Sequence, residues 1–149
     1  MVRVMASGVF DLLHSGHLHF LEEARKLGDE LVVVVATDKT VRERKHEPIT
    51  GQDMRLKMVA ALRPVDLAVL GHEGDMFEIV AELKPDIIAL GFDQVHDEVA
   101  IETELAKRGV PARVVRLPQL NDDLSGTRKI ISKIIDWHMF NERMKKVEK

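Results

Sequence analysis

Short apolar runs alternate with amphipathic segments along the whole chain. The runs at 2–6, 31–36, 67–70, 86–90 and 112–117 have the length and β-branched content of buried strands. Between them, apolar residues at helical spacing predict helices at about 18–27, 53–62, 75–83 and 98–107. This order predicts an α/β fold with a doubly wound sheet of five parallel strands and helices on both faces.

Further residues indicate where the first helix ends and where a C-terminal helix begins. Gly28 stands where the first helix is expected to end. A C-terminal helix is expected over about 125–147, with Asp123 or Ser125 as its cap. Its apolar stripe is expected to pack across the sheet, and consists of Ile130, Ile131, Ile134, Ile135 and Trp137.

Length and composition bound the class of protein. The 149 residues suit one domain spanning 1–149, without a linker or repeat. A formal net charge of −3 and 4% aromatic residues give no basic footprint for nucleic acid, so no nucleic-acid partner is expected. The chain has no cysteine, and no apolar run approaches membrane-spanning length, so we expect a cytoplasmic protein with no membrane partner.

The most informative stretch is residues 5–17, where a predicted strand passes into a helix. Such a turn attracts anions, and Gly8 and Gly16 would let the backbone approach one. His14 and His17 are three residues apart, so both rings could donate to the same phosphate oxygens. The alternatives are a capping histidine beside a packed one, or a zinc site, which would need a further ligand such as His19 or Asp11.

Other polar groups are expected at the same edge of the sheet, because the carboxyl ends of parallel strands converge there. Asp11 would either hold a magnesium ion carried by a nucleoside triphosphate or act as a turn carboxylate, and the spacing does not choose between the two. The basic run 42–45, expected in a loop, and Arg55 would meet phosphates or form a solvated face. Pro48 and Gly51 make this loop irregular, as in a lid.

The run Gly-Val-Phe-Asp-Leu-Leu-His-Ser-Gly-His at 8–17 resembles the signature of the cytidylyltransferase-like nucleotidyltransferases. The resemblance extends through 36–38, 85–91 and 125–127. It implies a Rossmann-like three-layer α/β/α fold, magnesium with the triphosphate, and a homodimer. It further implies catalysis by His14, His17 and Arg55, with Asp11 as the metal position. The nucleotide-binding residues that it implies are Val9, Phe10, Gly16, Arg42, Lys45, Gly91, Asp93, Gln94 and Thr127.

The Gly-Phe-Asp-Gln form at 91–94 looks like that of the archaeal FAD synthases, which transfer AMP from ATP to FMN. Glycerol-phosphate cytidylyltransferases carry Asp-Asp-Trp after the glycine that matches Gly91 and an arginine in the segment before the last helix, whereas this chain departs from that pattern at Phe92 and Gln119. FMN adenylyl transfer is therefore the leading hypothesis. Cytidylyl transfer from CTP to glycerol 3-phosphate or another small phosphate is the runner-up. A non-catalytic nucleotide or flavin sensor and a flavodoxin-like electron carrier are the alternatives from other classes.

Overall fold

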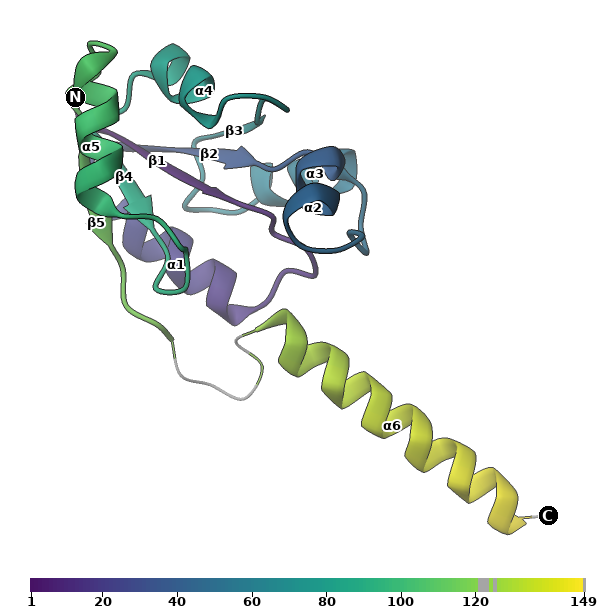
Figure 1. Ribbon diagram of the computed structural model, residues 1–149. Helices are drawn as coiled ribbons and strands as arrows, with labels where there is room; N and C mark the ends of the chain where they lie inside the picture. Colours follow the sequence, from purple (N-terminus) through teal and green to yellow (C-terminus); the bar gives the residue numbers. More distant parts are fainter. Residues whose placement is uncertain (121–123, 125, 149) are drawn as a thin grey trace.

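The computed structural model describes residues 1–120, 124 and 126–148 (Figure 1). Within them, five parallel strands lie in the order β3-β2-β1-β4-β5. The strands are β1 (Arg3–Gly8), β2 (Glu30–Val35), β3 (Leu67–Leu70), β4 (Ile87–Leu90) and β5 (Arg113–Arg116). The helices are α1 (Ser15–Arg25), α2 (Asp38–Arg44), α3 (Gln52–Ala60), α4 (Met76–Leu83), α5 (Glu98–Lys107) and α6 (Thr127–Glu148). The Rossmann-like fold expected from the sequence is confirmed.

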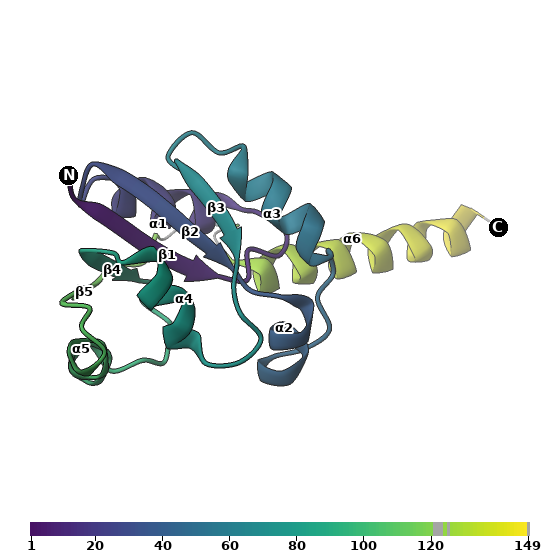
Figure 2. The ribbon, with the colours of Figure 1, turned by 90° about the horizontal axis from the view of Figure 1, so that it is seen from above.

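Successive residues of the central strand β1 supply the two faces of the sheet, because side chains alternate along a strand. Val4 and Ala6 pack with Leu21 of α1 on one face. Met5 packs on the other face, with Ile101 of α5 in the same core. Figure 2 shows α1 and α3 on one side of the sheet and α4 and α5 on the other.

The strand order has a switch point between β1 and β4. The chain winds outward from β1 to β3 and then returns to form β4 on the other side of β1. Loops that leave adjacent strands at a switch point diverge, which opens a crevice at the carboxyl ends of these strands. By this rule the turn that follows β1 and the loop that follows β4 would be the two sides of the crevice.

One helix lies where the sequence predicted only loop. Residues 38–44 form α2, which begins because the Thr37 side chain accepts a hydrogen bond from the N–H of Thr40 at 3.3 Å. Val41 is the buried residue of this helix. Because one apolar position cannot repeat at intervals of three or four, the sequence shows no helical pattern here. Arg42 therefore lies on a helix, and Lys45 is its C-terminal cap residue.

The role expected of Gly28 was wrong. Helix α1 ends at Arg25 with Lys26 as its cap, and Gly28 lies outside the left-handed region of backbone conformation. A Cβ atom at Gly28 would lie 2.8 Å from the carbonyl oxygen of Val2 and 2.8 Å from a methyl group of Val4. Glycine is needed here because the chain passes directly against β1.

Helix α6 corrects a second expectation. It projects away from the sheet in both views instead of packing across it (Figures 1 and 2). Ile134, Ile135 and Trp137 of the predicted stripe are each more than half exposed. An amphipathic pattern reports that a helix face is apolar, but not which surface covers it. The proposed caps Asp123 and Ser125 lie outside the described residues.

In the described part of the chain, no helix combines the length and the apolar character needed to cross a membrane.

The close approach at Gly28 predicts the effect of a single methyl group. Gly28→Ala is expected to lower the free energy of unfolding by about 1–3 kcal/mol, because the added Cβ forces β1 or the 26–29 turn to shift. Gly74→Ala is the matched control, since a Cβ there meets no atom within 4 Å, and it is expected to change stability by less than about 0.5 kcal/mol. Urea denaturation measures both, and equal free energies for the two variants would contradict the packing argument.

Candidate active site

The two histidines of the turn after β1 lie against each other. Their rings stack with centroids 3.7 Å apart and planes inclined by 23°. His14 is the N-cap of α1: its Nδ1 accepts hydrogen bonds from the N–H groups of Gly16 at 3.1 Å and His17 at 3.3 Å. The capping alternative therefore holds for His14, and these two N–H groups donate to its ring. Since Nδ1 accepts, the neutral His14 ring carries its proton on Nε2.

His17 is the more buried member of the pair. Burial, and then the charges of His14 and Lys45, lower the pKa of His17 to about 3, against a smaller opposing effect of Asp11. Its Nδ1 is buried and has no hydrogen-bond partner among the described residues. The Phe10 ring lies 5.4 Å from the imidazole, centroid to centroid. At neutral pH the site therefore holds an uncharged imidazole with an unpaired ring nitrogen.

Asp11 joins the histidine turn to two other segments. Its Oδ2 accepts from the N–H of Ile49 at 2.7 Å, and its Oδ1 accepts from the N–H of Thr50 at 3.0 Å and the Thr50 hydroxyl at 2.6 Å. Burial alone would raise the pKa of Asp11, but these hydrogen bonds and the charge of Arg55 outweigh it and lower the pKa. The backbone carbonyl of Asp11 accepts from the Thr127 hydroxyl at 3.0 Å, which places the start of α6 beside the turn.

These contacts bear on the metal position predicted at Asp11. Both carboxylate oxygens already accept hydrogen bonds, and the residue is 4% exposed. In the described part of the chain, no three His, Asp or Glu side chains are grouped so that they could hold a metal ion. The donor set at Asp11 does not fit a resident Mg²⁺, and its geometry favours the turn-carboxylate alternative.

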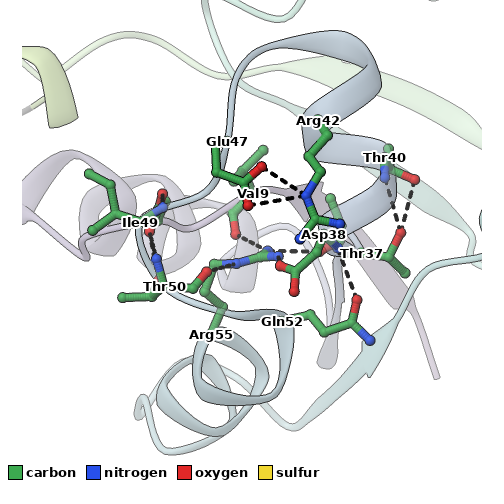
Figure 3. Close-up of polar contacts among 12 residues, drawn as sticks. Val9, Thr37, Asp38, Thr40, Arg42, Glu47, Ile49, Thr50, Gln52 and Arg55 are labelled. Atoms are coloured by element: carbon green, nitrogen blue, oxygen red, sulfur yellow. Dashed lines mark hydrogen bonds and ion pairs between the residues drawn. The ribbon is translucent and has the colours of Figure 1, made fainter.

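Arg55 lies inside the protein, with an exposed fraction of 1% (Figure 3). Its Nε donates to the carbonyl of Thr50 at 2.9 Å, and its Nη1 donates to the carbonyls of Val9 at 2.8 Å and Ala36 at 2.7 Å. Its Nη2 pairs with Asp38 at 2.7 Å, and this hydrogen bond is the main cause of the lowered pKa of Asp38. The guanidinium therefore holds the carboxyl ends of β1 and β2 and the segment before α3. This geometry gives Arg55 a positioning role.

The residues predicted in the loop after β4 lie on the other side of the crevice. The Gln94 side chain accepts from the N–H of Gly91 at 2.8 Å and donates to the carbonyl of Ser7 at 3.1 Å. It thereby ties this loop to the end of β1. Asp93 is exposed, and its carboxylate lies close to Gly91, where a Cβ would come within 3.3 Å of it.

Two basic residues of the α2 segment, Arg42 and Lys45, have different electrostatic partners. Arg42 is exposed, and its Nε donates to both carboxylate oxygens of Glu47, at 2.8 and 3.1 Å (Figure 3). Lys45 is exposed as well, and its charge acts on His17. The structure thus brings the charge of Lys45 into electrostatic range of His17, while Arg42 is paired with Glu47.

Several residues that build the site had no sequence signal. Ile49 and Thr50 hold Asp11 partly through backbone N–H groups, which leave no trace in side-chain chemistry. Asp38 occurs in the resemblance, but nothing in the sequence identifies it as the partner of Arg55. The long spacing of these contacts, 17 to 39 residues, is beyond any local pattern.

Paired histidines at the helix start, beside the switch point of a doubly wound parallel sheet, define a class of nucleotide-handling α/β proteins. Residues 5–145 match the cytidylyltransferase-like family, and the chain belongs to this family.

Individual proteins of known sequence or structure are similar to this chain over most of its length. The chain is 62% identical over 137 residues to the FAD synthase of Aciduliprofundum boonei, covering 91% of this chain and 92% of that protein. It is 53% identical over 137 residues to the FAD synthase of Archaeoglobus profundus, covering 91% and 88% respectively. Among solved structures, a Thermoplasma volcanium protein described as a lipopolysaccharide core biosynthesis protein matches with a TM-score of 0.80 and 51% identity. This match covers 81% of the present chain and 99% of that one.

The low pKa of His17 predicts a pH-dependent stability. The unfolded chain binds a proton at this residue near the ordinary pKa of 6.5, whereas the folded protein binds it only near 3. The unfolded state therefore holds more protons in between, and His17 makes the free energy of unfolding fall as pH decreases from about 6.5 toward 3. His17→Gln is expected to flatten this dependence.

Urea denaturation between pH 7 and pH 4 measures the slope in the wild type and the variant. His138→Gln, which removes an exposed histidine of α6, is the control and is expected to keep the wild-type slope. A His17→Gln slope equal to that of the wild type would show that His17 is not held in its neutral form by the fold.

Proposed function

We propose that this protein transfers AMP from ATP to FMN, producing FAD and pyrophosphate. The observation that carries the proposal is its high identity, over nine tenths of the chain, to two FAD synthases. The stacked histidines at the switch point support it, because this is where the fold class binds nucleotides and where two imidazoles could donate to a triphosphate.

The chemistry requires no protein nucleophile. A phosphate oxygen of FMN attacks the α-phosphorus of ATP, and the new P–O–P bond of FAD forms as the bond from the α-phosphorus to the bridging oxygen breaks. Pyrophosphate leaves with the electron pair of that bond. Catalysis of such a transfer rests on positioning and on stabilising the charge that develops on the phosphate oxygens.

The described residues supply both needs. His14 and the neutral His17 would donate from adjacent rings to the phosphate oxygens, and Lys45 would add a positive charge. Thr127 stands at the start of α6, hydrogen-bonded to the histidine turn. Asp11 and Arg55 would act indirectly, since their contacts hold the turn and the strand ends in place.

We assign the magnesium ion to the substrate, as MgATP, where it neutralises charge on the triphosphate. This agrees with the occupied carboxylate of Asp11. The cytoplasmic location expected from the sequence remains a prediction.

The reaction is tested by FAD formation from MgATP and FMN, followed by chromatography of the product. Removal of either imidazole, in His14→Ala or His17→Ala, is expected to lower kcat by about 10²-fold or more, because each removes a donor to the transition state. His138→Ala is expected to retain wild-type turnover. CTP with glycerol 3-phosphate forms the second arm, and product in that arm alone would replace the proposal with cytidylyl transfer.

Binding of FMN or ATP by the wild-type protein without release of pyrophosphate would instead identify a sensor. Full activity of His17→Ala would remove His17 from the proposed mechanism.

We also propose that α6 packs against a second copy of this chain, as the family resemblance implies. Its large apolar residues recur at intervals of three and four along one face: Ile130, Ile134, Trp137, Phe140, Met144 and Val147. From Ile134 onward these side chains are between 43% and 78% exposed. The face begins in an apolar groove of about 310 Å³, since Ile130 lines this groove together with Met54 and Met58 of α3.

Size and charge favour a second copy as the occupant. A standard interface buries roughly 800 Å² per partner, which is an average of about 100 Å² from each of the six side chains of this face and the two groove methionines, Met54 and Met58. Helix α6 carries more basic than acidic residues, whereas the chain as a whole has a net charge of −3. We therefore expect α6 to lie along the acidic body of the partner and not along the basic α6 of the partner.

Sedimentation at micromolar concentration tests this arrangement. The wild type is expected to be a dimer, and Trp137→Glu is expected to be a folded monomer, because it places a charge in the middle of the apolar face. Met139→Glu is the matched control: Met139 is 52% exposed but lies off this face, so the dimer should persist. A monomeric wild type, or equal dissociation of both variants, would rule out this interface.

A further inference from the structure

Arg116, at the end of β5, organises the loop that follows β4. Its Nη1 donates to the carbonyls of Gly91 at 3.0 Å and Gln94 at 2.8 Å, and its Nη2 donates to the carbonyl of His96 at 2.6 Å. Its Nε pairs with Glu98 at the start of α5. With a longer contact from Nη1 to the carbonyl of Phe92 at 3.5 Å, one guanidinium thus binds the backbone of residues 91–96 at four carbonyls. Nothing in the proposed reaction accounts for this rigidity.

The same loop is anchored to the central strand. The Gln94 side chain bridges the N–H of Gly91 and the carbonyl of Ser7, near the end of β1. Because β1 and β4 flank the switch point, residues 91–96 form one wall of the crevice whose other wall is the histidine turn. The wall is therefore both fixed and adjacent to the phosphate-handling residues.

This wall carries an exposed aromatic ring. Phe92 is 50% exposed, whereas Phe10 is 4% exposed, and Phe20 and Phe77 are partly buried. Outside α6, Phe92 is the one phenylalanine or tryptophan among the described residues that is mainly open to solvent. A flat apolar ring on a rigid crevice wall is a surface on which a planar heterocycle can stack.

We propose that Phe92 stacks on the planar nitrogen heterocycle of one substrate, and that Arg116 is the positioning residue that fixes it there. This inference rests on the proposed function, which brings two such rings to the crevice: the isoalloxazine of FMN and the adenine of ATP. The shared chemistry is a flat heteroaromatic face, and the substrate that supplies it is separated by experiment. Stacking of this kind affects affinity and not bond making, so it should influence KM more than kcat.

Steady-state kinetics of FAD formation provide the first test. Phe92→Ala is expected to raise the KM of one substrate roughly tenfold, with kcat changed by less than about twofold. Phe92→Trp should restore the wild-type KM. Val95→Ala is the matched control, because Val95 is an apolar residue of the same loop and is 96% exposed, but the proposal places no substrate ring against it.

A parallel test addresses Arg116. Arg116→Met, which cannot donate to these carbonyls, is expected to raise the KM of the same substrate as Phe92→Ala does. Glu98→Gln removes the charge that pairs with Arg116 but leaves these carbonyl contacts, so it should leave KM unchanged. A rise in the KM of the other substrate would refute the positioning role.

Flavin fluorescence identifies the ring. If residue 92 stacks on the isoalloxazine, FMN bound to Phe92→Trp will be quenched more strongly than FMN bound to the wild type, and the KM of FMN will be the one that rises in Phe92→Ala. If the ring is adenine, the KM of ATP will rise and the FMN emission will match that of the wild type.

Two results would overturn the inference: the same KM values in Phe92→Ala and Val95→Ala for both substrates, or an increase in both KM values together with a lower Tm. A wild type that forms no FAD would instead refute the proposed function, which is a separate result.

Discussion

The buried guanidinium of Arg55 is the constraint on which the site depends. A fully buried charge is stable only when its donors are paired, and Arg55 meets this requirement with three backbone carbonyls and the carboxylate of Asp38. Two of these carbonyls, those of Val9 and Ala36, lie just beyond β1 and β2. The third belongs to Thr50 (Figure 3). The pairing of one side chain therefore fixes the relative positions of the segments that surround the crevice.

The turn after β1 is strained, and tertiary contacts hold it. Phe10 and Leu12 adopt positive φ values of 56° and 50°, which non-glycine residues rarely do. The Phe10 ring packs over Gly8, where a Cβ would lie 3.0 Å from the ring, so any larger residue at this position would push against Phe10. Between the two strained residues, Asp11 accepts hydrogen bonds from Ile49 and Thr50. These hydrogen bonds offset the strain of the turn that leads into the paired histidines. Strained backbone of this kind is common at functional sites.

The need to pair polar groups and to cover apolar surface also explains the loop after β4 and the C-terminal helix. In the loop, Arg116 satisfies backbone carbonyls, and a rigid wall results. In α6, a 22-residue helix about 33 Å long presents an apolar face that the described part of its own chain does not cover. The guanidinium of Arg116 has its partners within the fold, whereas the apolar face of α6 is the surface for which we propose a partner outside it.

Local patterns determined the five strands, four of the helices between them and the pair of histidines, because strand and helix periods and a three-residue spacing are properties of contiguous sequence. They missed α2, which depends on the Thr37 cap and a single buried valine, Val41. Only the tertiary structure decided the neutral state of His17, the partners of Asp11 and the projection of α6. The physical reason is that burial, hydrogen bonding and packing join residues far apart in the chain, as in the 39-residue separation of Asp11 and Thr50.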